Sequence, residues 1–318
     1  MDTSIWIWLG FAAFTLALLA FDLGVVHRKN HVPSLREAIG LSLFYIALAL
    51  TFGAGVFWVR GEEAGTAFLT GYLIEKALSV DNIFVFAVIF GAFAVPPALQ
   101  YRVLFWGVLG ALVMRLLLIA AGATLIAEFH WIIYILGAFL IFTGVKMWTA
   151  GPAEEDFEQN RILRWTRAIL PVADGPHTGK FVVRRAGALL ATPLLLVLIL
   201  VEVTDLIFAL DSIPAIFAVT TDPFIVYTSN VFAILGLRVL YFALAGVMDK
   251  FYALKQGLAL LLVFIGGKML INGVYGEHAI PTEWALLITA LLIFGSIGFS
   301  LAFPKRVPIG HSAPSISL

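Results

Sequence analysis

The sequence contains no cysteine and few charged residues. The absence of cysteine from all 318 residues excludes disulfide bonds, thiolate metal sites and cysteine nucleophiles. Charged residues make up 13% of the chain and hydrophobic residues 61%, whereas an average soluble domain is about one quarter charged. This composition predicts apolar membrane spans joined by short loops, in contact with the lipid bilayer. The formal net charge is zero, so nothing indicates a nucleic-acid partner.

Apolar stretches of about 20 residues predict an all-α polytopic membrane protein with about nine transmembrane helices. We treat residues 1–318 as a single transmembrane domain. The first stretch lacks the basic start of a signal peptide and is longer than its apolar region, so we expect a retained helix. The predicted spans are 5–26, 38–59, 66–93, 102–126, 131–149, 187–217, 224–247, 254–272 and 284–303.

Basic residues in the loops predict the orientation. Fourteen Lys and Arg residues fall in alternate loops on one side, and only Arg60 falls on the other. The positive-inside rule then places the N-terminus outside and the C-terminus in the cytoplasm. The long loop 150–186 is therefore cytoplasmic, and its mixed acidic, basic and apolar residues fit either an amphipathic helix lying on the membrane or a solvated linker.

Two parts of the chain can be superposed. Residues 75–83 (Glu-Lys-Ala-Leu-Ser-Val-Asp-Asn-Ile) match residues 205–213 (Asp-Leu-Ile-Phe-Ala-Leu-Asp-Ser-Ile). Each is followed by an arginine in the next span and by a lysine 31 or 30 residues further on, namely Arg115 with Lys146 and Arg238 with Lys268. We therefore predict two three-helix repeats, 66–149 and 187–272, with 5–59 and 284–303 as additional helices. Because three is odd, the second copy crosses the membrane in the opposite sense, as in many secondary transporters.

Polar residues within the spans predict a metal site. A charge at the bilayer centre costs about 3 kcal/mol on insertion scales, so these residues must face one another or water. Carboxylate, amide and hydroxyl oxygens suit hard cations such as Mn²⁺, Ca²⁺ and Mg²⁺. We expect two half-sites, Asp81 with Asn82 and Asp211 with Ser212. The full candidate ligand set is Asp81, Asn82, Asp211, Ser212, Glu75 and Asp205, and the candidate coupling or charge-pairing residues are Glu202, Arg115, Arg238, Lys146 and Lys268.

Helical spacing constrains this site. Glu75 and Asn82 are seven residues apart and share a helix face, as do Asp205 and Ser212. Glu75 and Asp81 are six residues apart, about 240° around a regular helix, so they converge on one ion only if the helix breaks. The length of span 187–217 and its proline at 214 predict a kink or break there. Asp22 is either an extra ligand or a snorkelling surface charge.

The two matched motifs, together with residues 191–242, resemble the TerC/Alx family of bacterial membrane proteins, and the resemblance extends over about residues 5–304. The family is similar in repeat plan to the LysE exporter superfamily and is named for tellurium resistance. The resemblance implies a multi-pass protein of the bacterial inner membrane that exports a metal ion, with Mn²⁺ as the transported ion and no prosthetic group.

Three functions compete at this point. The first is export of a divalent cation, most readily Mn²⁺, through a midmembrane carboxylate site. The second is a non-transporting membrane scaffold or assembly factor in tellurium or metal stress, with the buried charges as structural bridges. The third, an intramembrane aspartyl protease, is disfavoured because neither Asp81 nor Asp211 lies in a Gly-x-Gly-Asp context, so we expect no enzymatic activity.

Overall fold

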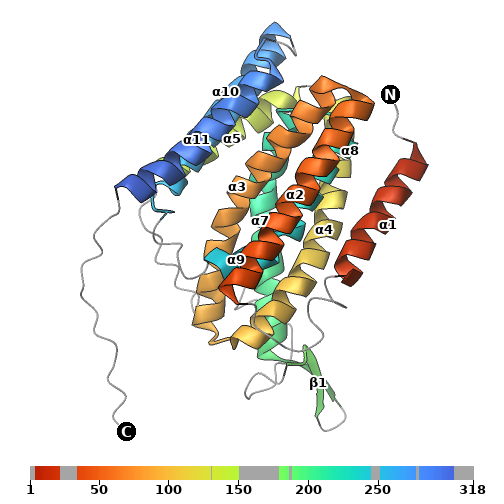
Figure 1. Cartoon of the computed structure of the whole chain (residues 1–318), viewed down its shortest axis with the longest axis vertical. Coiled ribbons are helices and arrows are strands. Elements are labelled where there is room, and N and C mark those ends of the chain that lie inside the picture. The colour runs from red at the N-terminus through yellow and green to blue at the C-terminus, as the bar shows by residue number, and fades with distance from the viewer. Residues whose placement is uncertain are drawn as a thin grey trace.

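A computed structural model describes residues 4–21, 34–129, 131–149, 179–185, 188–244, 251–276 and 279–303, without the side chains of Asp81 and Phe84. The helices run side by side as a bundle (Figure 1). Asp22, the side chain of Asp81 and most of the 150–186 loop lie outside the described residues, so the predictions for them stay predictions.

The described residues form ten helices and one short hairpin. The helices are α1 (Ile5–Phe21), α2 (Leu35–Arg60), α3 (Glu62–Ala92), α4 (Pro97–Glu128), α5 (Ile132–Thr149), α7 (Pro193–Phe217), α8 (Pro223–Leu235), α9 (Leu237–Leu244), α10 (Leu254–Tyr275) and α11 (Thr282–Ala302). The strands β1 (Val182–Arg185) and β2 (Ala188–Ala191) pair antiparallel.

Six of these helices are long and apolar enough to cross a membrane, and α8 with α9 adds a seventh if the bent pair is one span. The helix α1 has only 17 residues. The helix α3 has 31 residues, but Glu75, Lys76 and Asp81 interrupt its apolar sequence. A helix overlaps each of the nine predicted ranges, but nine membrane crossings stay a prediction.

Local sequence explains where several helices begin. Ser34 and Glu37 form a capping box at the start of α2, in which the Ser34 amide donates to Glu37 Oε2 at 2.7 Å. Asp222 caps α8 by accepting a hydrogen bond from the Phe224 amide at 2.9 Å. Gly61 alone separates α2 from α3, and its φ of 94° is in the left-handed region that glycine tolerates.

The predicted span 187–217 is wrong at its start. Residues Ala188–Ala191 form strand β2, and the helix α7 begins only at Pro193. The apolar run Ala-Leu-Leu-Ala suits a strand as well as a helix, and four residues are too few for periodicity to decide. Proline is well accommodated in the first turn of a helix, where its missing amide hydrogen costs nothing.

Of the predicted kink or break in this span, the break is absent, because Pro214 lies in the last turn of α7 and the helix continues to Phe217. The bend occurs instead in the following span, where α8 and α9 meet at Gly236 with a 40° change of direction. A side chain at Gly236 would place its Cβ 2.9 Å from Nζ of Lys76, so the glycine makes room for that lysine.

Four helices form the centre of the bundle. Both α3 and α4 pack against α7 and α8, while α2 covers α3 and α9 from outside. The helices α5, α10 and α11 form a second group, at the upper left of Figure 1, in which α10 packs against both others and α11 contacts α3. The centre of the bundle is therefore enclosed by helices from both predicted repeats.

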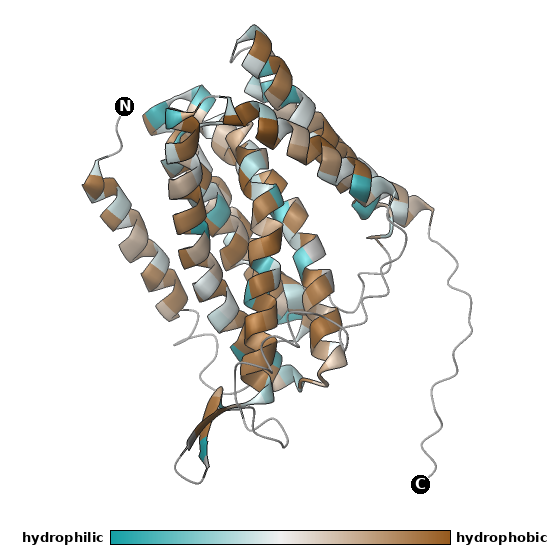
Figure 2. Cartoon of the chain, turned by 180° about the vertical axis from the view of Figure 1, so that it is seen from behind, coloured by the Kyte–Doolittle hydropathy of each residue, from teal (hydrophilic) through white to brown (hydrophobic). Residues whose placement is uncertain are grey.

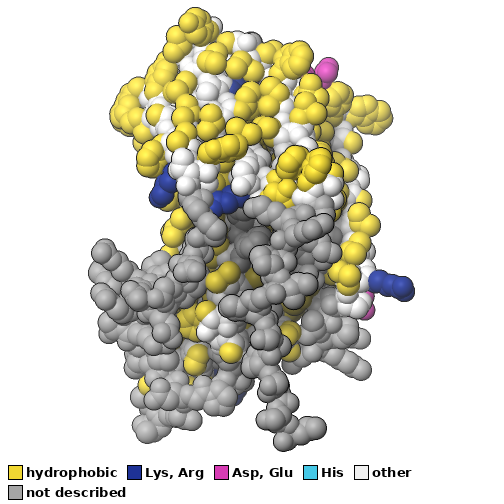
Figure 3. All heavy atoms as spheres, turned by 90° about the vertical axis from the view of Figure 1, so that its left-hand side faces the viewer, with side chains coloured by type: hydrophobic (Ala, Val, Ile, Leu, Met, Phe, Trp, Pro, Cys, Tyr) yellow, Lys and Arg dark blue, Asp and Glu magenta, His cyan; other side chains and the backbone are white. Residues whose placement is uncertain are grey.

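The outer surface is apolar. Hydrophobic residues cover the outward faces of the helices in Figure 2, and hydrophobic side chains dominate the upper part of the face in Figure 3. Among the exposed residues are Trp58, Trp6 and Tyr275, each more than three quarters exposed. A water-soluble protein rarely shows so large an apolar surface, whereas a lipid environment requires one.

Two glycines allow α5 and α10 to approach closely. A Cβ at Gly144 would lie 2.7 Å from the carbonyl oxygen of Ala259, and a Cβ at Gly266 would lie 2.6 Å from that of Gly137. These two contacts are reciprocal, because the same offset of 122 residues relates Gly144 to Gly266 and Gly137 to Ala259. Reciprocal contacts are typical of an interface with two-fold symmetry.

Alanine at Gly144 or at Gly266 is expected to lower the free energy of unfolding by about 1–3 kcal/mol, because the methyl group must displace a backbone carbonyl. Gly267→Ala is the matched control, since a Cβ there meets nothing within 4 Å. It should be neutral or slightly stabilising, because alanine favours helix. Unfolding in mixed micelles measures all three; equal effects at the three positions would contradict the packing.

Candidate functional site

The guanidinium of Arg115 lies at the centre of the bundle. This residue of α4 is 1% exposed and is among the largest fully buried side chains. Its Nη1 donates to the Glu75 carboxylate and, at 2.6 Å, to Asn230 Oδ1. Its Nε and Nη2 each donate to Asp205 at 3.3 Å. One arginine therefore joins two carboxylates, from α3 and α7, and an amide from α8.

Two further polar residues complete this group, which we call the Arg115 cluster: Glu75, Asn82, Arg115, Asp205, Ser212 and Asn230. Asn82 Nδ2 donates to Asp205 Oδ1 at 3.1 Å. Ser212 accepts from Arg115 Nη1 at 3.4 Å and lies within hydrogen-bonding reach of Glu75. The predicted shared faces, Glu75 with Asn82 and Asp205 with Ser212, are confirmed by these contacts.

The pairing in the cluster crosses between the matched motifs. The amide of Asn82 on α3 binds the acid of α7, and the hydroxyl of Ser212 on α7 faces the acid of α3. Both acids are almost fully buried, so each needs a counter-charge to stay ionised in an apolar environment. Two carboxylates against one guanidinium give this triad a formal charge of −1 when all three are ionised.

The structure separates Asp211 from Ser212. Ser212 is buried in the Arg115 cluster, whereas Asp211 is only partly buried and faces Thr143 and Lys146 of α5. Neighbouring residues of a helix point about 100° apart, so a half-site of Asp211 with Ser212 does not form in this arrangement. The described residues contain no group of three or more His, Asp or Glu side chains placed to hold a metal ion.

The other predicted charge-pairing residues lie away from the two acids. Arg238, on α9, lies over the rings of Tyr101 and Phe105 at 4.3 and 5.4 Å from their centroids. Lys268 is buried, and its Nζ donates at 2.9 Å to the carbonyl of Ala218 at the end of α7, where the helix dipole favours a cation. Lys146 is exposed.

Glu202 lies between the cluster and one end of the bundle. It precedes Asp205 by one helical turn on α7 and is partly buried. A Cβ at Gly110 of α4 would lie 2.0 Å from Glu202 Oε1, so only a glycine leaves space for this carboxylate. Its Oε2 has no hydrogen-bond partner among the described residues.

Comparison with known proteins now identifies the family. The model of the integral membrane protein TerC family matches residues 60–307, which is most of the chain and includes every residue of the Arg115 cluster. The chain belongs to the TerC family. It is therefore a multi-pass integral membrane protein, in agreement with its apolar helices.

Relatives in the TerC family cover nearly the whole chain. A membrane protein of Myxococcus xanthus, STKORF319, is 52% identical over 98% of this chain and 97% of its own length. The "putative membrane-bound redox modulator Alx" of Escherichia coli K12 is 52% identical over 85% of this chain and 87% of its own. A membrane protein of Rickettsia felis is 44% identical over 91% and 96%. No solved structure matches.

Sequence reasoning missed one member of the cluster in this TerC-family chain. Asn230 was not among the candidate ligands, although its Oδ1 accepts a hydrogen bond of 2.6 Å from Arg115 Nη1. Its Nδ2 donates back to the carbonyl of Val226 at 3.0 Å, which fixes the amide orientation. The sequence did contain a signal, because Asn230 is a polar amide within an apolar span, and such a side chain usually faces the protein interior.

Proposed function

We propose that this TerC-family protein exports a divalent cation, most readily Mn²⁺, through a carboxylate site near the middle of the membrane. The observation that supports this function is the convergence of Glu75 and Asp205, one from each matched motif, on a single buried guanidinium. Intramembrane carboxylates are costly and usually mark a pathway for ions or substrate.

The proposed transporter architecture is an inverted repeat of α3–α5 and of α7–α10 within a protein of nine spans. The reciprocal glycine contacts of α5 with α10 support it, as do the crossed contacts of Asn82 with Asp205 and of Ser212 with Glu75. In such transporters the site lies where the repeats meet.

In the proposed mechanism the arginine and the cation compete for the same oxygens. Arg115 neutralises Glu75 and Asp205 when no ion is bound, which keeps both carboxylates tolerable in an apolar interior. A divalent cation that reaches the carboxylates displaces the guanidinium, and Asn82 and Ser212 supply further oxygen ligands of the kind that hard cations prefer. Asp81 and Asp211 are proposed as flanking carboxylates, with Glu202 on the approach.

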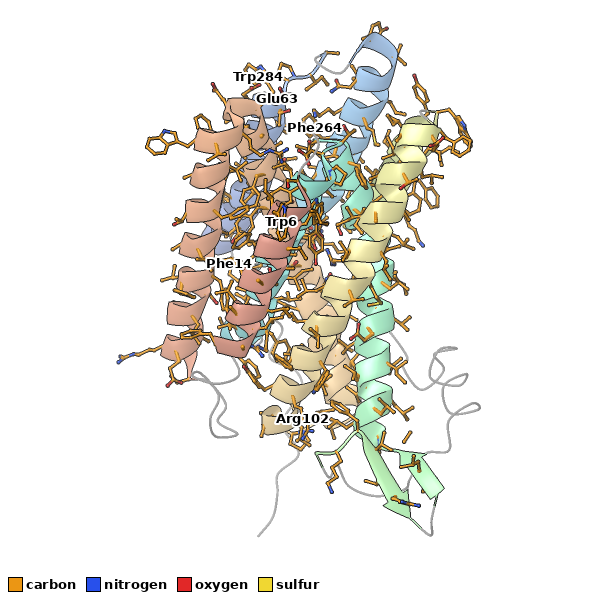
Figure 4. All side chains as sticks on the ribbon, turned by 90° about the vertical axis from the view of Figure 1, so that its right-hand side faces the viewer. Trp6, Phe14, Glu63, Arg102, Phe264 and Trp284 are labelled. Atoms are coloured by element: carbon orange, nitrogen blue, oxygen red, sulfur yellow. The ribbon has the colours of Figure 1, made fainter. Side chains whose placement is uncertain are left out.

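The proposed orientation is that of a bacterial inner-membrane protein with its N-terminus outside and its C-terminus in the cytoplasm. Arg102 and the hairpin then mark the cytoplasmic end of the bundle, and Glu63 marks the opposite end (Figure 4). Export against a gradient needs an energy source. A carboxylate that binds either a proton or the metal ion couples export to inward proton movement by competition.

Flux measurements test the proposed function. The full chain is reconstituted into vesicles that contain a Mn²⁺-sensitive dye, and Mn²⁺, Ca²⁺, Mg²⁺ and Zn²⁺ are added one at a time. We expect Mn²⁺ entry well above that of protein-free vesicles. Entry should be faster when the vesicle interior is more acidic than the outside, because protons then leave as Mn²⁺ enters. No divalent flux above the protein-free level would rule out the transporter.

The alternative function is a membrane scaffold without transport. The pairing of Arg115 with both carboxylates also favours it, because a structural bridge between α3, α4 and α7 has the same contacts. Co-purified partner proteins together with absent flux would support the scaffold. A redox role of the kind named for the Alx relatives would require a redox-active group other than a thiol in this chain, because the sequence has no cysteine.

A further inference from the structure

A row of buried oxygen atoms without hydrogen-bond partners follows one face of α3. The atoms are Tyr72 Oη, Glu75 Oε2, Ser79 Oγ and Asn82 Oδ1, and none has a partner among the described residues. All four residues are buried, and three of them are 1% exposed or less. Their spacing of three, four and three residues places them on one face of the helix.

These oxygens differ from most buried hydroxyls of the chain. Thr70 and Thr228, for example, donate to the carbonyl four residues earlier at 2.8 Å, the usual way to satisfy a hydroxyl within a helix. Thr15, Ser42 and Thr289 also lack a partner, but they lie singly on three different helices. Only on α3 do such atoms, within the described residues, form a row.

The chemistry of the row favours a cation. Glu75 Oε2, when the carboxylate is ionised, and Asn82 Oδ1 are acceptors and cannot donate. Each therefore requires a donor or a positive charge, and a buried acceptor without either is costly. Hydroxyl oxygens such as those of Tyr72 and Ser79 are neutral oxygen donors that a hard, partly hydrated cation accepts alongside carboxylate and amide oxygens.

Cavities lie beyond both ends of the row. At the end marked by Glu63 in Figure 4, a cavity of about 450 Å³ contacts α3 at Glu63, Ala64 and Ala67. Toward the other end, a cavity of about 10 Å³, enough for about one water molecule, lies between Phe86 and Asp205. From Ala67 to Phe86 is roughly 28 Å along a helix, close to the thickness of the hydrocarbon core.

We propose that this face of α3 lines the route of the transported cation, with Tyr72 and Ser79 as oxygen ligands in addition to Glu75 and Asn82. The inference rests on the proposed transport function and specifies its path. Arg115 lies beside Glu75, at the middle of the row, and blocks the route while it is paired with both carboxylates. The cation passes from one oxygen to the next about one helical turn away, and the small cavity beside Asp205 continues the route toward the cytoplasmic end.

Single cysteines test the route directly, because the chain has no native cysteine. Ser79→Cys places a thiol in the row, and Ala77→Cys places one at similar depth, two residues away and on the opposite face of α3. Both side chains are small and buried, so the two variants are matched. Each variant is reconstituted and treated with a cationic, membrane-impermeant methanethiosulfonate reagent, with and without Mn²⁺.

We expect the Ser79→Cys thiol to react about tenfold faster than the Ala77→Cys thiol, because a hydrated site favours the reactive thiolate and an apolar one suppresses it. Mn²⁺ should slow the reaction at Ser79→Cys only. Equal rates at the two positions, or no effect of Mn²⁺, would overturn the route. If wild-type protein transports Mn²⁺ in the same vesicles while the rates are equal, the path is wrong and the transport function stands.

A second variant removes one ligand and keeps its packing. Tyr72→Phe deletes the hydroxyl but retains the ring that stacks on Phe68 at 6.4 Å. Mn²⁺ flux should fall about three- to tenfold, the loss expected for one neutral oxygen contact. Tyr45→Phe, at a buried tyrosine of α2 outside the row, is the control and should transport like wild type. Unchanged flux in Tyr72→Phe would exclude Tyr72 as a ligand.

Discussion

Replacing Arg115 by leucine is expected to lower the free energy of unfolding by about 3–5 kcal/mol, the usual cost of removing one partner from a buried ion pair. The substitution leaves the carboxylates of Glu75 and Asp205 buried without their shared counter-charge. It also removes a donor from Asn230. Equilibrium unfolding of the purified protein in mixed micelles measures the change.

Two controls make this result specific. Arg60→Leu breaks the ion pair of Arg60 with Asp222, in which the two side chains are 23% and 31% exposed. It should lower the free energy of unfolding by at most about 1 kcal/mol, because exposed ion pairs contribute little. Combining Arg115→Leu with Glu75→Gln and Asp205→Asn should recover most of the lost stability, because no buried charge of the triad is then left unpaired. A loss below 1 kcal/mol for Arg115→Leu alone would contradict the central role of this arginine.

Neutralising either acid of the cluster is expected to reduce Mn²⁺ flux about 100-fold. Glu75→Gln and Asp205→Asn keep the side-chain size and remove one negative charge from the proposed site. Loss of one buried charged partner costs about 3 kcal/mol of binding, which corresponds to roughly two orders of magnitude. Initial rates of Mn²⁺ entry into dye-loaded vesicles, at equal amounts of reconstituted protein, measure the effect.

The same assay distinguishes the cluster from the other candidate acids. Glu128→Gln changes an exposed carboxylate at the end of α4, the helix that carries Arg115, and should not alter flux. Asp211→Asn should retain most of the flux, because Asp211 faces α5 and not the cluster. Full loss in Asp211→Asn with normal flux in Asp205→Asn would move the site to the other face of α7.

Much of the fold follows from the sequence, because long apolar runs specify membrane helices directly. The face shared by Glu75 and Asn82, and that shared by Asp205 and Ser212, followed from helical periodicity alone, and their contacts confirm both. The errors are local. The strand at Ala188–Ala191 and the bend at Gly236 depend on tertiary contacts over short segments whose sequences also suit a helix.

The choice between the two matched arginines was beyond the sequence. Arg115 and Arg238 occupy equivalent places in the predicted repeats, yet Arg115 binds both acids and Arg238 lies over aromatic rings. The difference depends on neighbours that the motifs do not include, such as Tyr101 and Phe105 below Arg238 and Asn230 beside Arg115. Charge alone cannot tell which of the two arginines binds Glu75 and Asp205; the neighbouring residues decide it.

The glycine contacts between α5 and α10 restrict how the two halves of the protein can move. Backbone atoms meet there with no side chain between them, at Gly144 and at Gly266. A sliding motion of one helix along the other would bring larger residues into these gaps and cost packing energy. A rotation about the line of contact keeps both close backbone contacts in place. Any change of access from one side of the bilayer to the other is therefore expected to pivot on this pair, with α3 and α7 swinging at a distance from it.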